Sequence, residues 1–119
     1  MGGEAFLSTR QQTITTDSFQ MALEPEELVE TQQGVETVGY VAIDGGTGTW
    51  NGINFRARMT FASYRELFQP INFGQTHAAI PSFIASIASY NGADNSHLRF
   101  DNADLNSVDV KIEEDTTRN

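Results

Sequence analysis

One loop in the last third of the chain carries side chains that suit the recognition of a sugar. A carboxylate and an amide can bind sugar hydroxyls while an aromatic ring covers the apolar face of the sugar. The side chains of this kind are Tyr90, Asn91, Asp94, Asn95 and Arg99. Because an asparagine-glycine pair is also a common turn signal, the loop is either a carbohydrate-binding site or a simple turn.

Acidic clusters occur at two places and could supply oxygen ligands to calcium. The clusters are Glu24, Glu26 and Glu27, and then Glu113, Glu114 and Asp115. Carboxylate oxygens suit this hard cation, but the spacing fits no EF-hand loop. We favour the alternative that the charges are solvated and keep an exposed sheet edge from aggregating. The sequence therefore predicts no required cofactor, with calcium at the second cluster as the alternative.

Signatures of catalysis are scarce in this sequence. It contains no cysteine, no G-x-S-x-G motif, no phosphate-binding loop and no H-E-x-x-H motif. The two histidines, His77 and His97, would need Asp94 or Asp101 beside them to form a metal site. A carboxylate pair for glycoside hydrolysis is an alternative that sequence alone does not test, because it needs a defined separation in space. We predict that the chain is not an enzyme and has no catalytic residue.

The composition limits the partners and the location of the protein. Its 119 residues suit one domain, and 16 acidic residues against 7 basic ones give a net charge of −9. Such a surface repels phosphate backbones, so we expect no nucleic-acid partner. No stretch approaches the roughly 20 apolar residues that span a bilayer, so we expect no membrane insertion. A surface rich in threonine, asparagine and glycine with a single lysine predicts an extracellular or cell-surface location.

Strand signals dominate the chain and predict an all-β fold. Alternating or threonine-rich runs, separated by turn residues, are typical of an antiparallel β-sandwich, here of about eight short strands with little helix. The predicted strands cover residues 9–15, 18–23, 35–43, 53–60, 71–73, 80–90, 97–100 and 107–112. Residues 44–49 are rich in glycine and threonine and predict a break between two halves. Residues 61–67 fit either a strand or a short helix.

Residues 9–24 resemble residues 98–113 at an offset of 89. The equivalent pairs include Arg10 with Arg99, Ser18 with Ser107, Glu24 with Glu113, and Phe19, Met21 and Leu23 with Val108, Val110 and Ile112. Both runs alternate and both end in an acidic cluster, which predicts two related hairpins. An apolar strand, 38–43, follows the first run, whereas we expect no such strand after the second.

The second half of the chain resembles the H-type lectin domain, a six-stranded antiparallel β-sandwich. The resemblance covers residues 67–115, from a proline-led apolar strand through the asparagine-glycine loop and an arginine-bearing strand to an alternating strand. The family ends on a strand of aromatic, spacer, alanine and isoleucine character, which this chain carries at its front as residues 38–43. Tandem relatives in large bacterial surface proteins look similar in both halves. The resemblance implies that the loop with Asn91, Asp94, Asn95 and Arg99 contacts a ligand.

The resemblance also implies one domain, 1–119, cut out of phase. Residues 9–46 are then displaced C-terminal strands, 47–66 a linker and strand, and 67–119 the N-terminal strands. The front strands either fold back onto the same chain or complete a neighbouring copy. We predict a non-catalytic extracellular module that self-associates by strand complementation, as an oligomer or filament; the alternative is a carbohydrate-binding adhesion module. The predicted exchange interface contains Val38, Tyr40, Val41, Ile43, Phe19, Met21 and Leu23.

Overall fold

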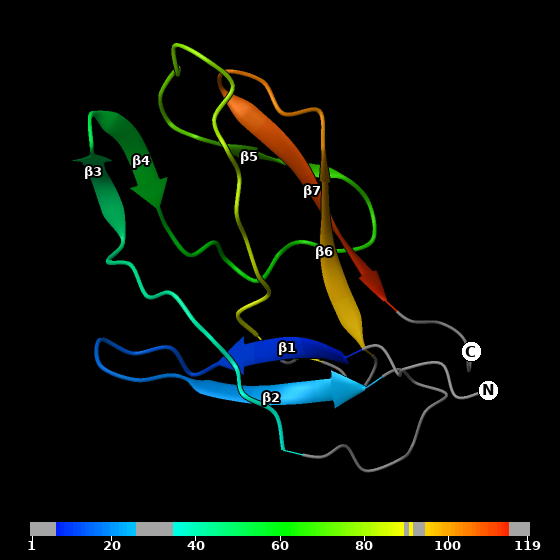
Figure 1. Cartoon of the computed structure of the whole chain (residues 1–119). Coiled ribbons are helices and arrows are strands. Elements are labelled where there is room, and N and C mark those ends of the chain that lie inside the picture. The colour runs from blue at the N-terminus through cyan, green and yellow to red at the C-terminus, as the bar shows by residue number, and fades with distance from the viewer. Residues whose placement is uncertain (1–6, 26–34, 90, 92–94, 115–119) are drawn as a thin grey trace, which may run out of the picture.

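The computed structural model describes residues 7–25, 35–89, 91 and 95–114, and these residues contain seven strands (Figure 1). The strands are β1 (Leu7–Gln12), β2 (Gln20–Pro25), β3 (Gly46–Trp50), β4 (Ile53–Ala57), β5 (Gln69–Asn72), β6 (Ser96–Asp101) and β7 (Ser107–Glu114). They form two two-stranded sheets, β1-β2 and β3-β4, and one three-stranded sheet in the order β5-β7-β6. Every pairing is antiparallel. The predicted all-β class is confirmed, and the described residues include no helix that could cross a membrane.

The β1-β2 hairpin, called hairpin A below, and the β6-β7 hairpin, called hairpin B, have the same register. Leu7 pairs with Pro25 in hairpin A, and their equivalents at an offset of 89, Ser96 and Glu114, pair in hairpin B. The equivalence continues through every pair to Gln12 with Gln20 and Asp101 with Asp109. The predicted repeat is therefore confirmed as two hairpins of one design.

The loops of the two hairpins also match. Thr13 and its equivalent Asn102 both have positive φ, 52° and 53°. In hairpin A the Thr15 amide donates to the Ser18 carbonyl at 2.8 Å, and in hairpin B the equivalent Asp104 amide donates to Ser107 at 2.9 Å. The side chains of the same two residues also accept hydrogen bonds from the backbone. The Ser18 amide donates to the Thr15 hydroxyl, and the Ser107 amide donates to the Asp104 carboxylate.

The core lies under the three-stranded sheet. Val108 and Val110 of β7 are 0% and 1% exposed, and no other apolar residue in the described part is buried so fully. Both lie on β7, the middle strand of this sheet, with β5 on one side and β6 on the other. Met21, the equivalent of Val110 in hairpin A, is 38% exposed on a strand that has a single neighbour in its sheet.

The glycine- and threonine-rich segment, predicted as a break between two halves, contains most of a strand. Gly46–Trp50 forms β3, which returns as β4 through a two-residue loop with φ of 50° at Asn51 and 77° at Gly52. Asparagine-glycine loops with two positive φ values match the twist of a hairpin. Gly48 is needed in β3 because a β-carbon there would lie 2.7 Å from the Phe55 ring.

Two predicted strands, 35–43 and 80–90, form no strand in the described residues. Their composition favours β-structure, but a strand also needs a neighbour to accept its backbone hydrogen bonds. Neither segment pairs with a strand in the part of the chain that the structure describes. Pro81 also removes one donor from the second segment. Residues 61–67 contain neither of their predicted elements, and the remaining predicted strands are present with shifted ends.

The strand ends in the hairpins follow from single residues. β1 ends at Gln12 because Thr13 adopts positive φ, so the predicted strand 9–15 is too long. Pro25 is the last paired residue of β2, opposite Leu7, so β2 extends two residues beyond the predicted strand 18–23. A terminal position tolerates proline because its missing amide is not needed there.

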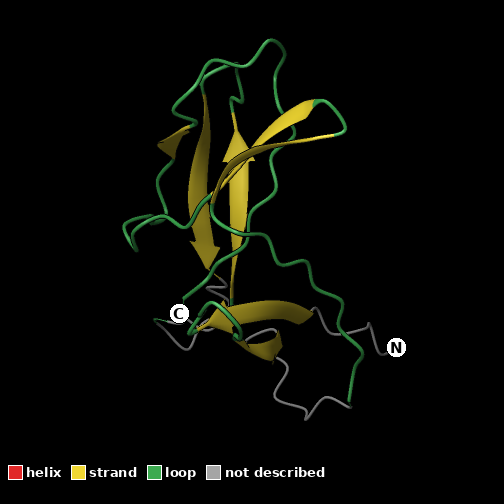
Figure 2. Ribbon diagram, turned by 90° about the vertical axis from the view of Figure 1, so that its left-hand side faces the viewer, coloured by secondary structure: helices red, strands yellow, loops and turns green. Residues whose placement is uncertain are grey.

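Hairpin A lies crosswise at one end of the three-stranded sheet in both views (Figures 1 and 2). It meets the beginning of β6, where the side chain of Arg10 donates to Ser96. Hairpin A thus contacts the rest of the chain but pairs with no other described strand, and the choice between the two closures stays a prediction.

Candidate interaction surface

A buried ion pair within hairpin A also contacts the beginning of hairpin B. The Arg10 Nη1 atom lies 2.9 Å from Glu24 Oε2, and the two side chains are 6% and 7% exposed. The same nitrogen donates to Ser96 Oγ at 3.0 Å, while Nη2 donates to the Ser89 carbonyl at 2.9 Å. Asn95 Nδ2 donates to the Glu24 carbonyl at 3.2 Å. We call Arg10 and Glu24 the buried docking pair.

The environment of the buried docking pair explains why it holds the hairpins in one orientation. A guanidinium carries several donors in a fixed plane, so a carboxylate, a hydroxyl and a carbonyl are recognised only when all three are correctly placed. Burial removes both charges from water, so the net stabilisation from such a pair is small. Removal of one partner, however, leaves the other charge buried without a counter-charge. The pair therefore specifies the docking geometry more than it adds stability.

Hairpin B contains the same ion pair at its surface. Arg99 and Glu113 are the equivalents of Arg10 and Glu24, and Arg99 Nε lies 3.1 Å from Glu113 Oε2. Here the side chains are 59% and 39% exposed. Lys111 Nζ lies 3.9 Å from the same carboxylate oxygen. The same arginine-glutamate pair therefore occurs twice in the chain, buried in hairpin A and exposed to solvent in hairpin B.

Residues 38–43 form an extended, unpaired segment that crosses hairpin A on the way to β3 (Figure 1). Tyr40, Val41 and Ile43 are 69%, 86% and 59% exposed. The Tyr40 ring meets the Phe19 ring edge-on, with centroids 5.1 Å apart. The structure thus brings together two members of the predicted exchange interface, Phe19 and Tyr40.

The other members of the predicted exchange interface are placed as follows. Val38 and Leu23 are half-buried, whereas Met21 is exposed. No described backbone group forms a ladder with residues 38–43. Tyr40, Val41 and Ile43 thus stay largely exposed, and no described strand pairs with the backbone of this segment.

A second apolar region surrounds the β3-β4 hairpin, and the sequence analysis missed it. Trp50 and Ile53 are 74% and 71% exposed, and Met59 and Phe61 are 62% and 92% exposed. The alternation of residues 53–60 predicts a strand with one buried side. In the described structure no other sheet packs on that apolar side. The alternation therefore identified an apolar face, but it did not show whether another part of the same chain buries that face.

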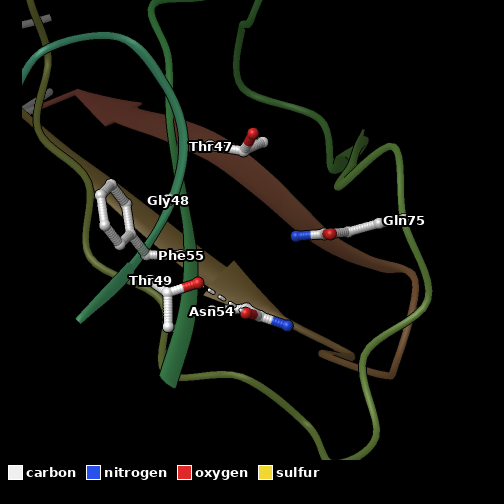
Figure 3. Close-up of a pocket in the computed structure, with 6 residues that line it drawn as sticks. All are labelled: Thr47, Gly48, Thr49, Asn54, Phe55 and Gln75. Carbon is white, nitrogen blue, oxygen red and sulfur yellow. Dashed lines mark hydrogen bonds between the residues drawn. The ribbon is translucent and has the colours of Figure 1, made fainter. Parts of the chain in front are cut away.

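Figure 3 shows an open hollow beside the β3-β4 hairpin, which the sequence analysis also missed. Thr49 Oγ1 donates to Asn54 Oδ1 at 3.1 Å, and Gln75 faces the same space from a neighbouring segment. The Arg56 and Arg58 side chains donate to the carbonyls of Phe73 and Asn72, which holds this segment beside β4. The hollow is lined by hydroxyl and amide groups and by the Phe55 ring, with no charged side chain.

The predicted sugar-binding residues are divided between different surroundings. Asn91 is exposed, Asn95 donates to the Glu24 carbonyl, and Arg99 is paired with Glu113. Tyr90 and Asp94 lie outside the described residues. Two of the five side chains are thus engaged by the protein, and sugar binding by this loop stays a prediction.

The predicted calcium ligands are not clustered within the described residues. Glu113 is shared between Arg99 and Lys111, Glu114 is exposed, and Asp115 lies outside the described part. The described residues include no group of three acidic, histidine or cysteine side chains close enough to hold a metal ion. Calcium binding at this cluster stays a prediction.

One carboxylate in the described structure has a shifted pKa. The backbone amides of Asn106 and Ser107 donate to Asp104 Oδ1 at 2.7 and 2.8 Å. These hydrogen bonds favour the charged form and hold the pKa of Asp104 below its ordinary value of 3.8, with Asn106 contributing most. Asp104 therefore acts as a turn-forming residue and remains ionised at neutral pH.

Comparison with known proteins places the chain beside one very long protein. The chain is 30% identical over 116 residues, 95% of its length, to a segment of halomucin from Haloquadratum walsbyi. It spans about 1% of the length of that relative. No protein-family profile and no solved structure matches the chain. The similarity covers almost the whole chain and therefore includes both hairpins.

Proposed function

We propose that this chain is a non-catalytic structural module of an extracellular protein, and that copies of it associate by adding a strand to an open sheet edge. The name of the long relative describes a mucin, a class of extracellular proteins. The acidic composition and the resemblance to H-type lectin domains in surface proteins support the same location.

The observation that carries the proposal is the unpaired segment 38–43. Its residues, Val-Gly-Tyr-Val-Ala-Ile, have strand composition, yet the segment joins none of the described sheets and Val41 is 86% exposed. Full burial of one large apolar side chain is worth about 1.5 to 3 kcal/mol. Strand addition would bury Tyr40, Val41 and Ile43 and pair the backbone groups of the segment.

Hairpin B indicates which edge receives the strand. In hairpin B the outer edge of β7 pairs with β5 along Ser107–Val110. The equivalent edge in hairpin A is that of β2, from Ser18 to Met21, and no described strand lies along it. An open edge next to exposed apolar side chains favours association. We therefore assign this edge as the acceptor for residues 38–43 of a second copy.

The dimensions of the chain support the need for a partner. Its Cα radius of gyration is 16.4 Å, against about 13.5 Å for a compact chain of this length. Large apolar side chains stay exposed on the crossing segment and around the β3-β4 hairpin. A second copy on these faces would supply the burial that the single chain lacks.

The proposal is tested by the mass of the protein in solution as a function of concentration. We expect the wild-type chain to assemble and Val41→Pro to remain monomeric, because proline removes a backbone donor from the added strand. Val35→Pro is the matched control, since Val35 is also exposed and lies outside the donated strand. Its assembly should equal that of the wild type.

Two results would overturn the proposal. One is a wild-type chain that stays monomeric at every concentration, which would mean that residues 38–43 need no second copy. The other is assembly of Val41→Pro to the wild-type extent. Equal thermal unfolding of both proline variants would show that any loss of assembly does not come from loss of the fold.

A further inference from the structure

We infer that Arg99 and Glu113 form a second docking pair, and that its partner is another β-hairpin built like hairpin B. The inference comes from the duplication and does not depend on strand addition. Arg99 and Glu113 occupy the positions in hairpin B that the buried docking pair occupies in hairpin A. The N–O distances of 3.1 and 2.9 Å show that both pairs are already formed.

The buried docking pair defines what such a partner must offer. Ser96, the first residue of hairpin B, gives Arg10 a hydroxyl. The segment before hairpin B gives Arg10 the carbonyl of Ser89 and gives the Glu24 carbonyl the side-chain amide of Asn95. A partner for Arg99 and Glu113 therefore needs an asparagine-serine pair at the start of its first strand. It also needs a backbone carbonyl shortly before that pair.

The exposed pair of Arg99 and Glu113 has donors left to bind a hydroxyl and a carbonyl group of a partner. Among the described residues, Arg99 makes its ion pair through Nε, and no hydrogen bond within the described part uses Nη1 or Nη2. These two nitrogens are the ones that Arg10 uses to bind hairpin B. The 59% exposure of the Arg99 side chain leaves room for a partner to approach.

Hairpin A of a second copy does not meet the requirement. The residues equivalent to Asn95 and Ser96 in hairpin A are Phe6 and Leu7, which carry no hydroxyl or amide side chain. Ser96 of the chain itself is already bound to Arg10. The fitting partner is thus a further hairpin that begins with asparagine and serine, as a following repeat in a longer protein would supply.

The position of Lys111 distinguishes the two pairs. Lys111 lies opposite Arg99 in hairpin B, where hairpin A has Ala22 opposite Arg10. Its Nζ lies 5.0 Å from the centre of the Phe68 ring and 3.9 Å from Glu113 Oε2, so hairpin B carries a second cation beside the pair. A docked hairpin should accept this extra charge with a carboxylate or a carbonyl group.

The test lengthens the chain by one repeat. In the lengthened chain, residues 1–114 are followed by a copy of residues 26–119. Hairpin B is then followed by the same sequence that follows hairpin A in the present chain, and this sequence ends in a third hairpin. We expect the third hairpin to dock on Arg99 and Glu113 through its copies of Asn95 and Ser96. Hydrogen exchange of the third hairpin's backbone amides measures the docking.

Arg99→Met in the lengthened chain should speed this exchange at least about tenfold, and Ser→Ala at the copy of Ser96 should weaken protection in the same direction. Arg99→Met in the present chain is the control and should speed exchange in hairpins A and B by no more than about fivefold, because an exposed ion pair is worth at most about 1 kcal/mol. Equal protection of the third hairpin with and without the Arg99→Met substitution would overturn the inference, as would no protection in the parent lengthened chain. Light scattering on the same samples separates docking within one chain from self-association.

Discussion

Hairpins A and B have one register, one loop geometry and one cross-strand ion pair, but they differ in their neighbours. Hairpin B has β5 along β7, and its Val108 and Val110 are almost completely buried. Hairpin A has no third strand in its described sheet, but its ion pair is covered by the beginning of β6. Hairpin A thus buries its ion pair and exposes Met21, whereas hairpin B buries Val110 and exposes its ion pair.

The difference shows that local structure and burial have separate origins in this protein. The matching loops and registers require only the sequence of each hairpin, because their hydrogen bonds join residues close together in the chain. The burial of a side chain depends on which distant segment arrives beside it. Variants at equivalent positions of the two hairpins can therefore measure the contribution of the neighbours directly.

The largest difference is expected for the two arginines of the ion pairs. Arg10→Met leaves Glu24 buried without its cation, which should lower the free energy of unfolding by about 3 to 5 kcal/mol. Arg99→Met removes an exposed pair and should cost about 0 to 1 kcal/mol. Urea unfolding of both variants measures the contrast. Equal losses would mean that the burial of Arg10 and Glu24 has no energetic consequence.

The next difference concerns one apolar position. Val110→Ala removes two carbon atoms from the core and should destabilise the protein by about 2 kcal/mol. Met21→Ala at the equivalent exposed position should change the stability by less than about 1 kcal/mol. Thermal unfolding of the two variants checks this expectation. If Met21→Ala costs as much as Val110→Ala, the β2 edge is already covered in solution by another strand.

A smaller effect with opposite signs is expected in the two loops. Thr13 is β-branched at a φ of 52°, whereas Asn102 has the residue type that tolerates φ of 53°. Thr13→Asn should therefore stabilise the protein by about 0.5 to 1 kcal/mol, and Asn102→Thr should destabilise it by at least as much. Asn102→Thr also loses the bond from Nδ2 to Asp109. Stabilisation by both substitutions would show that the loops are not equivalent in solution.

The smallest expected effect is a pH dependence confined to hairpin B. The folded-state pKa of Asp104 is lowered, so its stabilising contribution is complete above the unfolded value of 3.8 and is lost as the pH falls through the folded value. Thr15 accepts the equivalent hydrogen bond in hairpin A without an ionisable group. Amide exchange in acid should therefore accelerate at Ser107 but not at Ser18.

Asp104→Thr is the control for the pH experiment. It places the hairpin A residue type in the hairpin B loop, and the acid-dependent acceleration at Ser107 should disappear. An acceleration that persists in Asp104→Thr would show that another group controls the loop of hairpin B.

Sequence reasoning found the residues of both ion pairs as equivalent positions, but it did not pair them. Arg10 and Glu24 were recognised as matching Arg99 and Glu113, because residue type and spacing are visible in one dimension. The separation of hairpin A and the beginning of β6 in sequence concealed the contact of Arg10 with Ser96. That contact, more than the loop with Asn91, forms the best-defined polar site in the described structure.

The errors in the predicted strands have one physical cause. Residues 38–43 have strand composition but no partner strand, and Gly46–Trp50 has linker composition but pairs with β4 through the Asn51–Gly52 loop. Intrinsic preference was therefore a weaker guide than the presence of a neighbour with a suitable turn. The glycine at position 48 serves the packing of Phe55, which composition does not show.

The sequence by itself determined the all-β class and the two matching hairpins, because alternation and turn residues act between residues close together in the chain. It also determined the acidic surface, because the net charge is the sum of the charged residues. Only the tertiary structure decided that Arg10 and Glu24 are buried while Arg99 and Glu113 are exposed. It also decided that β5 lies along β7 and that residues 38–43 remain unpaired. These outcomes depend on contacts between segments far apart in the chain, and identical local patterns cannot distinguish them.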